Sequence, residues 1–228
     1  MTDRKKRAVR SYVKRAGRMT SSQQRALDEL WPAYGIEFDE RPLDWNAIFG
    51  RDAPRVLEIG FGNGDTLVEQ AVERPDRDFL GVEVHEPGVG HCLIRIRETG
   101  ITNLRLIMHD AIEVLEKQIE GNTLTRINLY FPDPWPKKRH HKRRIVQPAF
   151  LALCHGALRP GGHLHVATDW AGYAEHIDEV VGESPLFALE ERRQHDGDRP
   201  LDRPGTKFER RGLRHGHSIV DWRFIVIK

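Results

Sequence analysis

The sequence predicts an α/β fold: a mostly parallel, seven-stranded sheet with helices on both faces and an antiparallel last strand. From Arg55 onward, short apolar runs of strand length alternate with segments whose apolar residues recur at helical spacing. This alternation is typical of parallel sheets, because each right-handed crossover packs its helix on a face of the sheet. The last two strands follow each other without a helix between them, so we expect that pair to run antiparallel.

The expected elements follow in a regular order. The seven strands are expected at 55–60, 78–84, 103–110, 126–131, 163–169, 187–192 and 218–228. Five helices are expected between them, at 64–74, 86–100, 111–119, 145–158 and 170–182. Gly100 ends the second helix, and the turn residues at 159–162 end the fourth.

The N-terminal part reads differently. Residues 1–45 are expected to form a basic, mobile arm that contains a helix of one or two turns within 20–31. The stretch 42–54 is rich in turn residues and reads as a linker. We therefore predict a single folded domain over 46–228.

Composition excludes several classes of protein. Hydrophobic residues make up 39% of the chain, charged residues 31%, and no run approaches the roughly 18 apolar residues of a membrane span. The N-terminus lacks the apolar core of a secretory signal. Cys92 and Cys154 occur at no metal-binding spacing. We therefore predict a cytoplasmic protein without a membrane partner or a metal, in which both cysteines lie in the core.

Charge is strongly segregated, although the net charge is only +2. Residues 1–25 hold nine Lys or Arg and one acid, and residues 137–144 hold six Lys or Arg and no acid. The rest of the chain carries 21 basic and 33 acidic residues, so an acidic body bears two basic segments. This segregation indicates a polyanionic partner, most simply nucleic acid.

Each of the first five predicted strands ends at an acid. These acids are Glu58, Glu83, Asp110, Asp133 and Asp169. In a parallel sheet the carboxyl ends of the strands share one edge, which is where open α/β folds bind ligands. A rim of like charges opposes stability, so we interpret it as a functional site rather than as a solvated surface.

A glycine-rich turn follows the first of these strands. Gly60, Gly62 and Gly64 permit a tight turn and let a ligand approach the backbone closely. The pattern departs from the dinucleotide fingerprint, because Asp65 stands where the third glycine should be. Asp65 also suits the simpler role of a negative charge at a helix N-terminus.

The acids around this turn favour a ligand that is positively charged and has no phosphate. S-adenosylmethionine fits this description, since it carries an ammonium, a sulfonium and an adenosine. Glu83, which lies 23 residues after Gly60, is placed to accept the ribose hydroxyls, and Asp110 the adenine amino group. Nicotinamide sites also use an acid to bind the ribose hydroxyls, so Glu83 alone does not distinguish the two kinds of cofactor.

A different role is expected for the acid after the fourth strand. Pro132 and Pro134 restrain the backbone on both sides of Asp133. Trp135 either provides a surface on which a base stacks or packs within the loop. The basic run Lys137–Arg144 follows at once, so we expect Asp133 and Asp169 to face a nucleic-acid substrate.

The stretches LEIGFGNG, GVEVH, FPDPWPKKRHHKRR, ATDW and TKFERRG occur in this order along the chain. Together they resemble the bacterial tRNA (guanine-N7)-methyltransferases, over roughly Arg55 to the C-terminus. The resemblance implies a Rossmann-like class I methyltransferase fold. It also implies transfer of a methyl group from S-adenosylmethionine, with S-adenosylhomocysteine as product, to N7 of a guanine at position 46 in the variable loop of tRNA. We expect a monomer, with a homodimer left open.

The resemblance also assigns roles to individual residues. The cofactor-binding residues would be Glu58, Gly60, Gly62, Glu83, Asp110 and Asp133, with Asp133 also catalytic. The substrate-binding residues would be Lys137, Asp169, Thr206, Lys207, Phe208 and Glu209. The RNA-contacting residues would be Arg139, His140, His141, Lys142, Arg143 and Arg144. Thr206 and Glu209 also match a helix capping box, T-x-x-E.

Three alternatives remain open at this point. The stretch PDPW is close to the Asp-Pro-Pro-aromatic loop of amino-group methyltransferases. An RNA-binding protein with an inactive cofactor pocket would keep the basic segments, although the complete row of strand-end acids disfavours it. A nicotinamide-dependent oxidoreductase is disfavoured by Asp65 and by the basic segments.

Overall fold

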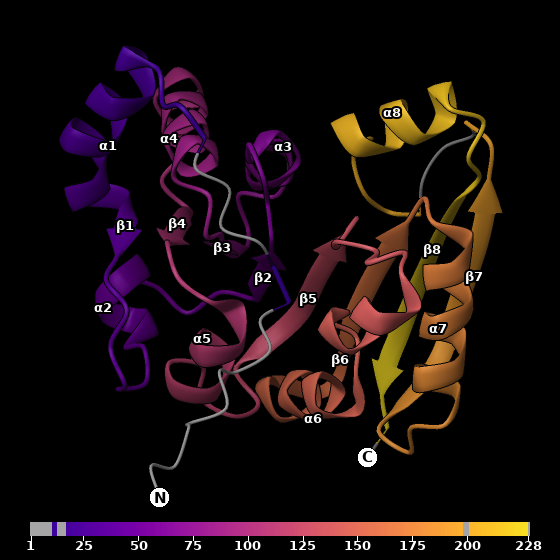
Figure 1. Cartoon of the computed structure of the whole chain (residues 1–228). Coiled ribbons are helices and arrows are strands. Elements are labelled where there is room, and N and C mark those ends of the chain that lie inside the picture. The colour runs from indigo at the N-terminus through magenta and orange to yellow at the C-terminus, as the bar shows by residue number, and fades with distance from the viewer. Residues whose placement is uncertain (1–10, 13–16, 198–200, 228) are drawn as a thin grey trace, which may run out of the picture.

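An eight-stranded sheet forms the centre of the protein, with the strand order β1-β4-β3-β2-β5-β6-β8-β7 (Figure 1). The computed structural model describes residues 11–12, 17–197 and 201–227. The strands are β1 (Gly35–Ile36), β2 (Arg55–Ile59), β3 (Asp78–Val82), β4 (Leu104–Ile107), β5 (Leu124–Tyr130), β6 (Leu158–Thr168), β7 (Phe187–His195) and β8 (Ile219–Val226).

The first six strands are parallel, and β8 runs antiparallel between β6 and β7. This confirms the predicted mostly parallel sheet with an antiparallel ending. All seven predicted strands are present. The eighth, β1, adds an edge strand of two residues that pairs with β4, and it is too short to show a strand pattern in the sequence.

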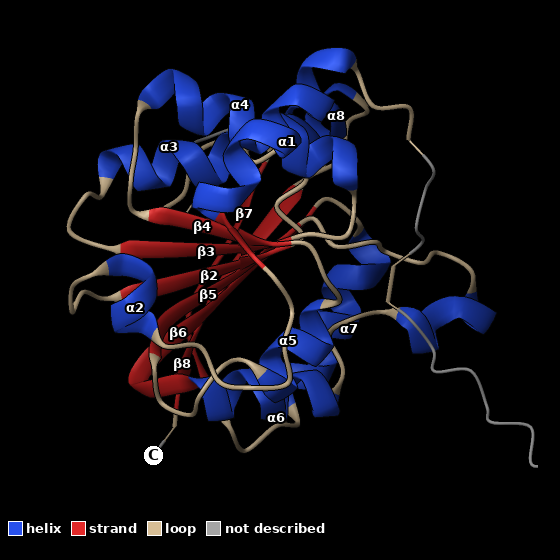
Figure 2. Ribbon diagram, turned by 90° about the vertical axis from the view of Figure 1, so that its left-hand side faces the viewer, coloured by secondary structure: helices blue, strands red, loops and turns tan. Residues whose placement is uncertain are grey.

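Two layers of helices enclose the sheet. The helices are α1 (Ser21–Tyr34), α2 (Trp45–Phe49), α3 (Asp65–Glu73), α4 (Glu86–Thr99), α5 (Ala111–Lys117), α6 (Pro148–Ala157), α7 (Ala171–Gly182) and α8 (Lys207–Arg214), with a 3-10 helix η1 (Lys138–Arg143). Figure 2 shows α1, α3, α4 and α8 on one face and α2, α5, α6 and α7 on the other. The central strands are apolar because both of their faces are buried.

The N-terminal region departs from the sequence prediction in two places. Helix α1 has 14 residues rather than one or two turns, because a capping box joins Thr20 and Gln23 and because Ala26 is fully buried. The side-chain amide of Gln23 also donates to the backbone carbonyl of Pro87 in α4, at 3.0 Å. The predicted linker contains α2, whose first residue, Trp45, is buried in the core.

The register of the central strands sets the level of the binding edge. Ile59 of β2 pairs with Val82 of β3 and with Leu129 of β5, so the three strands end together. The chain therefore leaves the sheet at neighbouring points after each strand. Gly60 follows β2 and donates its amide to Val82 at 2.8 Å.

Within the described part of the chain, no helix has the length and apolar character needed to cross a membrane. The same part offers no group of three or more His, Cys, Asp or Glu side chains arranged to hold a metal ion.

Candidate active site

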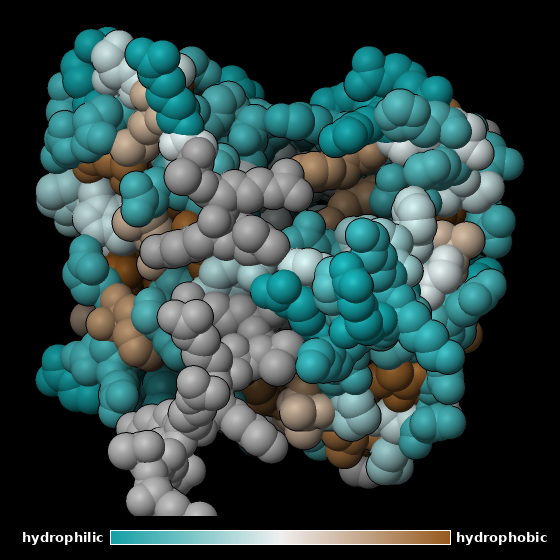
Figure 3. All heavy atoms as spheres, in the orientation of Figure 1, coloured by the Kyte–Doolittle hydropathy of each residue, from teal (hydrophilic) through white to brown (hydrophobic). Residues whose placement is uncertain are grey.

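A cavity of about 420 Å³ opens at the carboxyl edge of the parallel strands. Figure 3 shows a hollow between the α4 side and the α8 side of the molecule. The cavity is lined by the loops after β2, β3, β4 and β5, by the start of α8, and by Ser11 and Tyr12. Four of the five predicted strand-end acids line it: Glu58, Glu83, Asp110 and Asp133.

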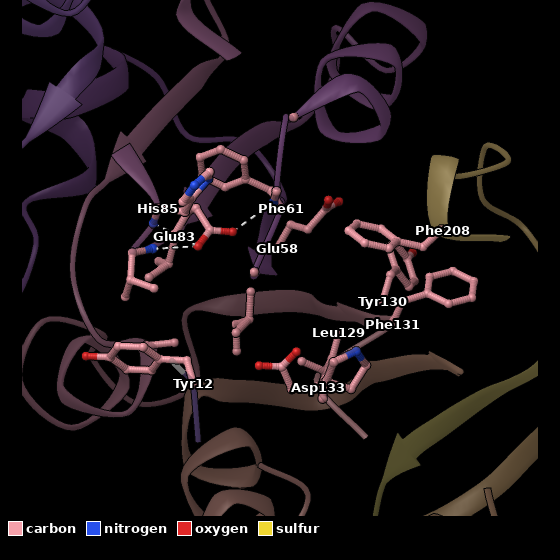
Figure 4. Close-up of a pocket in the computed structure, with 18 of the residues that line it drawn as sticks. Tyr12, Glu58, Phe61, Glu83, His85, Leu129, Tyr130, Phe131, Asp133 and Phe208 are labelled. Atoms are coloured by element: carbon pink, nitrogen blue, oxygen red, sulfur yellow. Dashed lines mark hydrogen bonds between the residues drawn. The ribbon is translucent and has the colours of Figure 1, made fainter. Parts of the chain in front are cut away.

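Glu83 organises the glycine-rich turn. One of its carboxylate oxygens accepts the Gly62 amide at 2.9 Å, and the other accepts the amides of Val84 and His85 at 2.7 and 3.1 Å (Figure 4). These three hydrogen bonds fix the orientation of the carboxylate at the edge of the turn. Glu83 also lines the cavity, where its carboxylate oxygens suit two ligand hydroxyls.

The turn itself leaves room for a ligand. Gly60 and Gly62 have φ values of 71° and 60°, which side-chain-bearing residues rarely adopt. A side chain added at Gly60 would meet no atom within 4 Å and would extend into open space. The residues present therefore fit a cofactor that lies against this backbone, with acids around it and no phosphate-binding cation among the turn residues.

Asp65 and Asp110 serve first as local helix residues. Asp65 is the first residue of α3, where its negative charge complements the helix N-terminus. Asp110 caps α5, because its side chain accepts the Ile112 amide at 3.0 Å. Its second carboxylate oxygen remains available to the cavity.

Glu58 is the buried acid of the cavity. It is only 3% exposed and accepts a hydrogen bond from the Gln70 amide at 3.0 Å. Burial raises the pKa of Glu58 to about 7, and the bond from Gln70 offsets only part of this rise. A cationic ligand would stabilise the ionised form of this buried carboxyl, because its positive charge would replace the solvation that is lost on burial.

Asp133 reaches the cavity from a strained loop after β5. The backbone φ is 53° at Phe131 and 44° at Trp135, so bulky residues take the left-handed conformation on both sides of the Pro132–Pro134 segment. Figure 4 shows the Asp133 carboxylate directed into the cavity, across from Glu58. Strain of this kind at a polar loop is typical of functional sites.

Trp135 packs within the loop and is covered on one ring face. The guanidinium carbon of Arg143 lies 4.1 Å from the ring centroid, and His140 meets the ring edge-on at 5.8 Å. The indole nitrogen donates to the Ser11 carbonyl at 2.9 Å. The structure therefore shows the packing role for Trp135, and it places residues 11–12 beside the cavity.

Helix α8 forms the wall next to the Asp133 loop, where Phe208 stacks on Phe131 with ring centroids 6.4 Å apart. The Thr206 hydroxyl accepts the Glu209 amide at 2.9 Å and Glu209 accepts the Thr206 amide at 3.1 Å, so the predicted capping box is present. Lys207 and Phe208 line the cavity from the first turn. The Phe208 ring lies against the glycine-rich turn, 3.6 Å from where a side chain at Gly62 would begin.

The predicted site residues fall into two groups. The cavity brings together Glu58, Gly60, Gly62, Glu83, Asp110, Asp133, Thr206, Lys207 and Phe208. Lys137, Asp169, Glu209 and the run 139–144 do not line it. Asp169 lies under α8, 3.5 Å from His217, and Glu209 is 4% exposed and occupied by the capping box. Glu209 therefore supports the wall in this structure, and its predicted substrate contact stays a prediction.

The basic run forms η1 on the surface beside the cavity. Lys137, Lys138, Arg139 and Lys142 are exposed. Arg144 is not, since it is 3% exposed and donates to the carbonyls of Pro134 and Gly172, both at 3.0 Å. Its guanidinium joins the Asp133 loop to α7 in this structure, and the RNA contact expected of Arg144 stays a prediction.

A buried ionic cluster was missed by the sequence analysis. Arg203, Asp221 and Glu209 are joined by hydrogen bonds of 2.6 to 2.9 Å. Burial raises the pKa of Asp221, but hydrogen bonds from His165 and Arg203 outweigh it and hold the pKa at about 2. One signal was visible in the sequence: His165 and Asp221 are polar residues in strands whose neighbours are apolar.

Comparison with known proteins decides the family. A family model described as "Putative methyltransferase" matches residues 52–222. The chain is 54% identical to a tRNA (guanine-N(7)-)-methyltransferase of Paraburkholderia xenovorans, over 95% of this chain and 82% of the relative. It is 50% identical to one of Klebsiella pneumoniae, over 97% and 93% of the two chains. The chain belongs to the tRNA (guanine-N7)-methyltransferase family.

Solved structures agree with this family at the level of the fold. An antibiotic-related methyltransferase superposes with a TM-score of 0.59 at 12% identity, covering 84% of this chain and 96% of the other. The 16S rRNA methyltransferase KamB gives a TM-score of 0.58 at 15% identity, covering 82% and 95%. The Rossmann-like class I methyltransferase fold implied by the sequence resemblance is thus confirmed. The family members are enzymes, so the cavity is a candidate active site.

Proposed function

We propose that the chain transfers a methyl group from S-adenosylmethionine to N7 of a guanine in tRNA, at position 46 of the variable loop. One observation carries the proposal: Asp133, from the loop that the basic run continues, shares a cavity with Glu58, Glu83, Asp110 and the glycine-rich turn. A cofactor site and an entry surface for a polyanion thus meet at one carboxylate. The names of the relatives supply the substrate.

S-adenosylmethionine would supply an activated methyl group on a sulfonium. Glu83 would hold the ribose hydroxyls and Asp110 the adenine amino group, while Gly60 and Gly62 would allow close approach of the backbone. Glu58 would face the cationic amino-acid end. Glu83 is already fixed by three backbone amides, so it is oriented before the ligand arrives.

The reaction asks for charge stabilisation rather than proton removal. Guanine N7 carries a lone pair and no proton, so no general base is needed to expose the nucleophile. Methylation leaves the base with a positive charge, and a carboxylate fixed nearby stabilises that charge as it develops. Asp133 also suits the guanine N1–H and amino group, which distinguishes guanine from adenine.

The exposed cations around the cavity would bind the tRNA backbone. Lys137, Lys138, Arg139 and Lys142 are the accessible members of the basic run. The N-terminal arm would add a second contact, although residues 1–10 and 13–16 lie outside the described part of the chain. Target bases in tRNA are stacked or paired, so entry requires extrusion of the base, at a cost of a few kcal/mol.

Replacing Asp133 with asparagine tests the assignment. Asp133→Asn keeps the size of the side chain and removes its charge, so turnover is expected to fall by roughly 100- to 1000-fold. The melting temperature, measured on the same samples, separates a loss of turnover from a loss of folding. The readout is nucleoside analysis of tRNA after incubation with labelled S-adenosylmethionine, at saturating cofactor.

The control is Asp52→Asn, which changes an acid whose side chain is 93% exposed and which precedes β2 at the other end of the strand. It should leave turnover unchanged. Label in a nucleoside other than 7-methylguanosine would refute the proposed reaction. Near-normal turnover of Asp133→Asn would refute the role of Asp133 alone.

A further inference from the structure

Arg203 joins segments that lie on both sides of the candidate active site. Its side chain has no exposed surface and forms a fork with Asp221 of β8, with distances of 2.6 Å from Nε and 2.9 Å from Nη2. Nη1 donates to Glu209 at 2.6 Å and to the Pro204 carbonyl at 3.2 Å. The guanidinium thus fixes a strand and a helix to each other.

The contact with Glu209 acts on the start of α8. The Glu209 oxygen that accepts from Arg203, Oε2, is the same one that accepts the Thr206 amide of the capping box. Arg203 is therefore joined directly to the capping box that begins α8. The first turn of this helix carries Lys207 and Phe208 into the cavity, where the Phe208 ring lies against the Gly62 turn.

The Arg203 guanidinium also contacts two aromatic side chains at the end of β5. The guanidinium carbon lies 5.4 Å from the ring centroids of both Tyr130 and Phe131. Phe131 has a strained backbone and stands two residues before Asp133. A single planar cation therefore touches the base of the Asp133 loop and, through Glu209, the first turn of α8, where Phe208 stacks on Phe131 with ring centroids 6.4 Å apart.

Stability alone does not account for such a cluster. Burying an ion pair costs desolvation, and apolar side chains of similar volume often serve a fold equally well or better. A planar fork that holds two carboxylates fixes distances and angles instead. Neither of the acids bound by Arg203 lines the cavity, so the cluster acts on the site only through the segments that it holds.

We propose that Arg203 is a positioning residue, which sets the spacing between the Asp133 loop and the first turn of α8. The inference rests on the proposed methyl transfer and adds a residue that does not itself touch the substrate. A base bound between Asp133 and Phe208 would be aligned by this spacing. Misplacement by about 1 Å costs on the order of 100-fold in rate.

The test uses Arg203→Lys in the full chain, with Asp221→Asn as a second variant. Lysine keeps the charge but loses the planar fork, so it cannot hold both acids in the same geometry. We expect kcat for tRNA methylation to fall by roughly 10- to 100-fold in Arg203→Lys. Binding of S-adenosylhomocysteine, measured by calorimetry, should keep a stoichiometry near one and a Kd within about threefold of the wild type.

Arg51→Lys is the matched control. Arg51 also forms two hydrogen bonds to one buried acid, Asp78, at 2.8 and 2.6 Å, but it lies before β2 and away from the cavity. A merely structural role of Arg203 would lower the folded fraction, so kcat and the stoichiometry of cofactor binding would fall together. That result would overturn the proposal, as would equal losses of kcat in the Arg51 and Arg203 variants.

The remaining outcomes are also decisive. If Arg203→Lys does not fold, Asp221→Asn must show the loss of kcat with unchanged cofactor binding. Failure of both variants to fold would make Arg203 a stability residue and overturn its positioning role. Wild-type protein that makes no 7-methylguanosine would refute the proposed function itself, whereas active wild type with an equally active Arg203→Lys would refute the role of Arg203 alone.

Discussion

At the scale of single residues, Glu58 shows how burial prepares an acid for a cationic ligand. Its neighbours Gln70 and Asn128 are neutral, and they form a buried chain of amide hydrogen bonds behind the carboxyl. Neutral partners orient the carboxyl without satisfying its charge. Burial therefore raises the pKa of Glu58 from 4.5 to about 7, and these amides together with the charges of Arg126 and Arg203 offset only part of the rise.

This titration predicts the pH dependence of cofactor binding. Below the raised pKa of about 7 Glu58 is protonated, and above it the carboxylate attracts the ligand's ammonium. Affinity for S-adenosylhomocysteine should therefore rise by about tenfold between pH 6 and pH 8, as the ionised fraction grows from about one tenth to nine tenths. Calorimetry at pH 6, 7 and 8 measures it.

Two substitutions complete this measurement. Glu58→Gln removes the titrating group, so its affinity should be flat over the same range. Glu69→Gln changes an exposed acid on α3 and should keep the wild-type profile. A Glu58→Gln protein that retained the full rise would show that another group titrates.

At the scale of elements, η1 is an exposed basic segment that a buried arginine anchors at its end. Its members Lys138, Arg139 and Lys142 are exposed, whereas Arg144, which follows its last residue, is buried and lies over the ring of Tyr173 of α7 at 5.0 Å. A run of six Lys or Arg and two His looks uniform in the sequence. Its division into exposed and buried members depends on where η1 meets α7, and no local pattern encodes this contact.

This division predicts opposite effects for two arginines in the same run. Arg144→Ala leaves the Pro134 and Gly172 carbonyls without their donor, so unfolding should become easier by about 1–3 kcal/mol. The melting temperature should drop by several degrees. Arg139→Ala removes an exposed side chain and should leave it unchanged while weakening tRNA binding. Equal thermal stability of the two variants, measured by differential scanning calorimetry, would contradict this assignment.

At the scale of the whole molecule, segregated charge gives the protein an oriented surface. The exposed part of the basic run stands beside the cavity, whereas the acidic excess is spread over the rest of the chain. In Figure 3 this side of the hollow is hydrophilic. An approaching polyanion is attracted to one edge and repelled elsewhere.

The salt dependence of tRNA binding tests whether the contact is localised to this edge. The triple variant Lys138→Ala, Arg139→Ala and Lys142→Ala should reduce the slope of log affinity for tRNA against log salt by roughly two to three. Alanine at Arg41, Lys117 and Arg159 removes the same charge from other exposed positions and should leave the slope nearly intact. Equal slopes for the two triple variants would rule out a localised RNA contact.

Sequence reasoning reached the parts of this molecule that local patterns encode. Alternating strands and helices indicated the sheet, and the acids at strand ends indicated its functional edge, because parallel strands bring such residues together without further information. The role of Arg203 could not be predicted from local patterns, since it depends on contacts with Asp221 and Glu209 from separate elements. Helix α2 was missed because five residues are too few for a periodic signal.

The left-handed backbone at Phe131 and Trp135 has a consequence for how the active site meets its substrate. Two residues held in an unfavourable conformation require the surrounding structure to enforce it, so the Asp133 loop is set when the chain folds. The conformational entropy of fixing that carboxylate is then lost once, at folding, and not again at each encounter with tRNA. Binding energy from the tRNA remains available for extruding the target base.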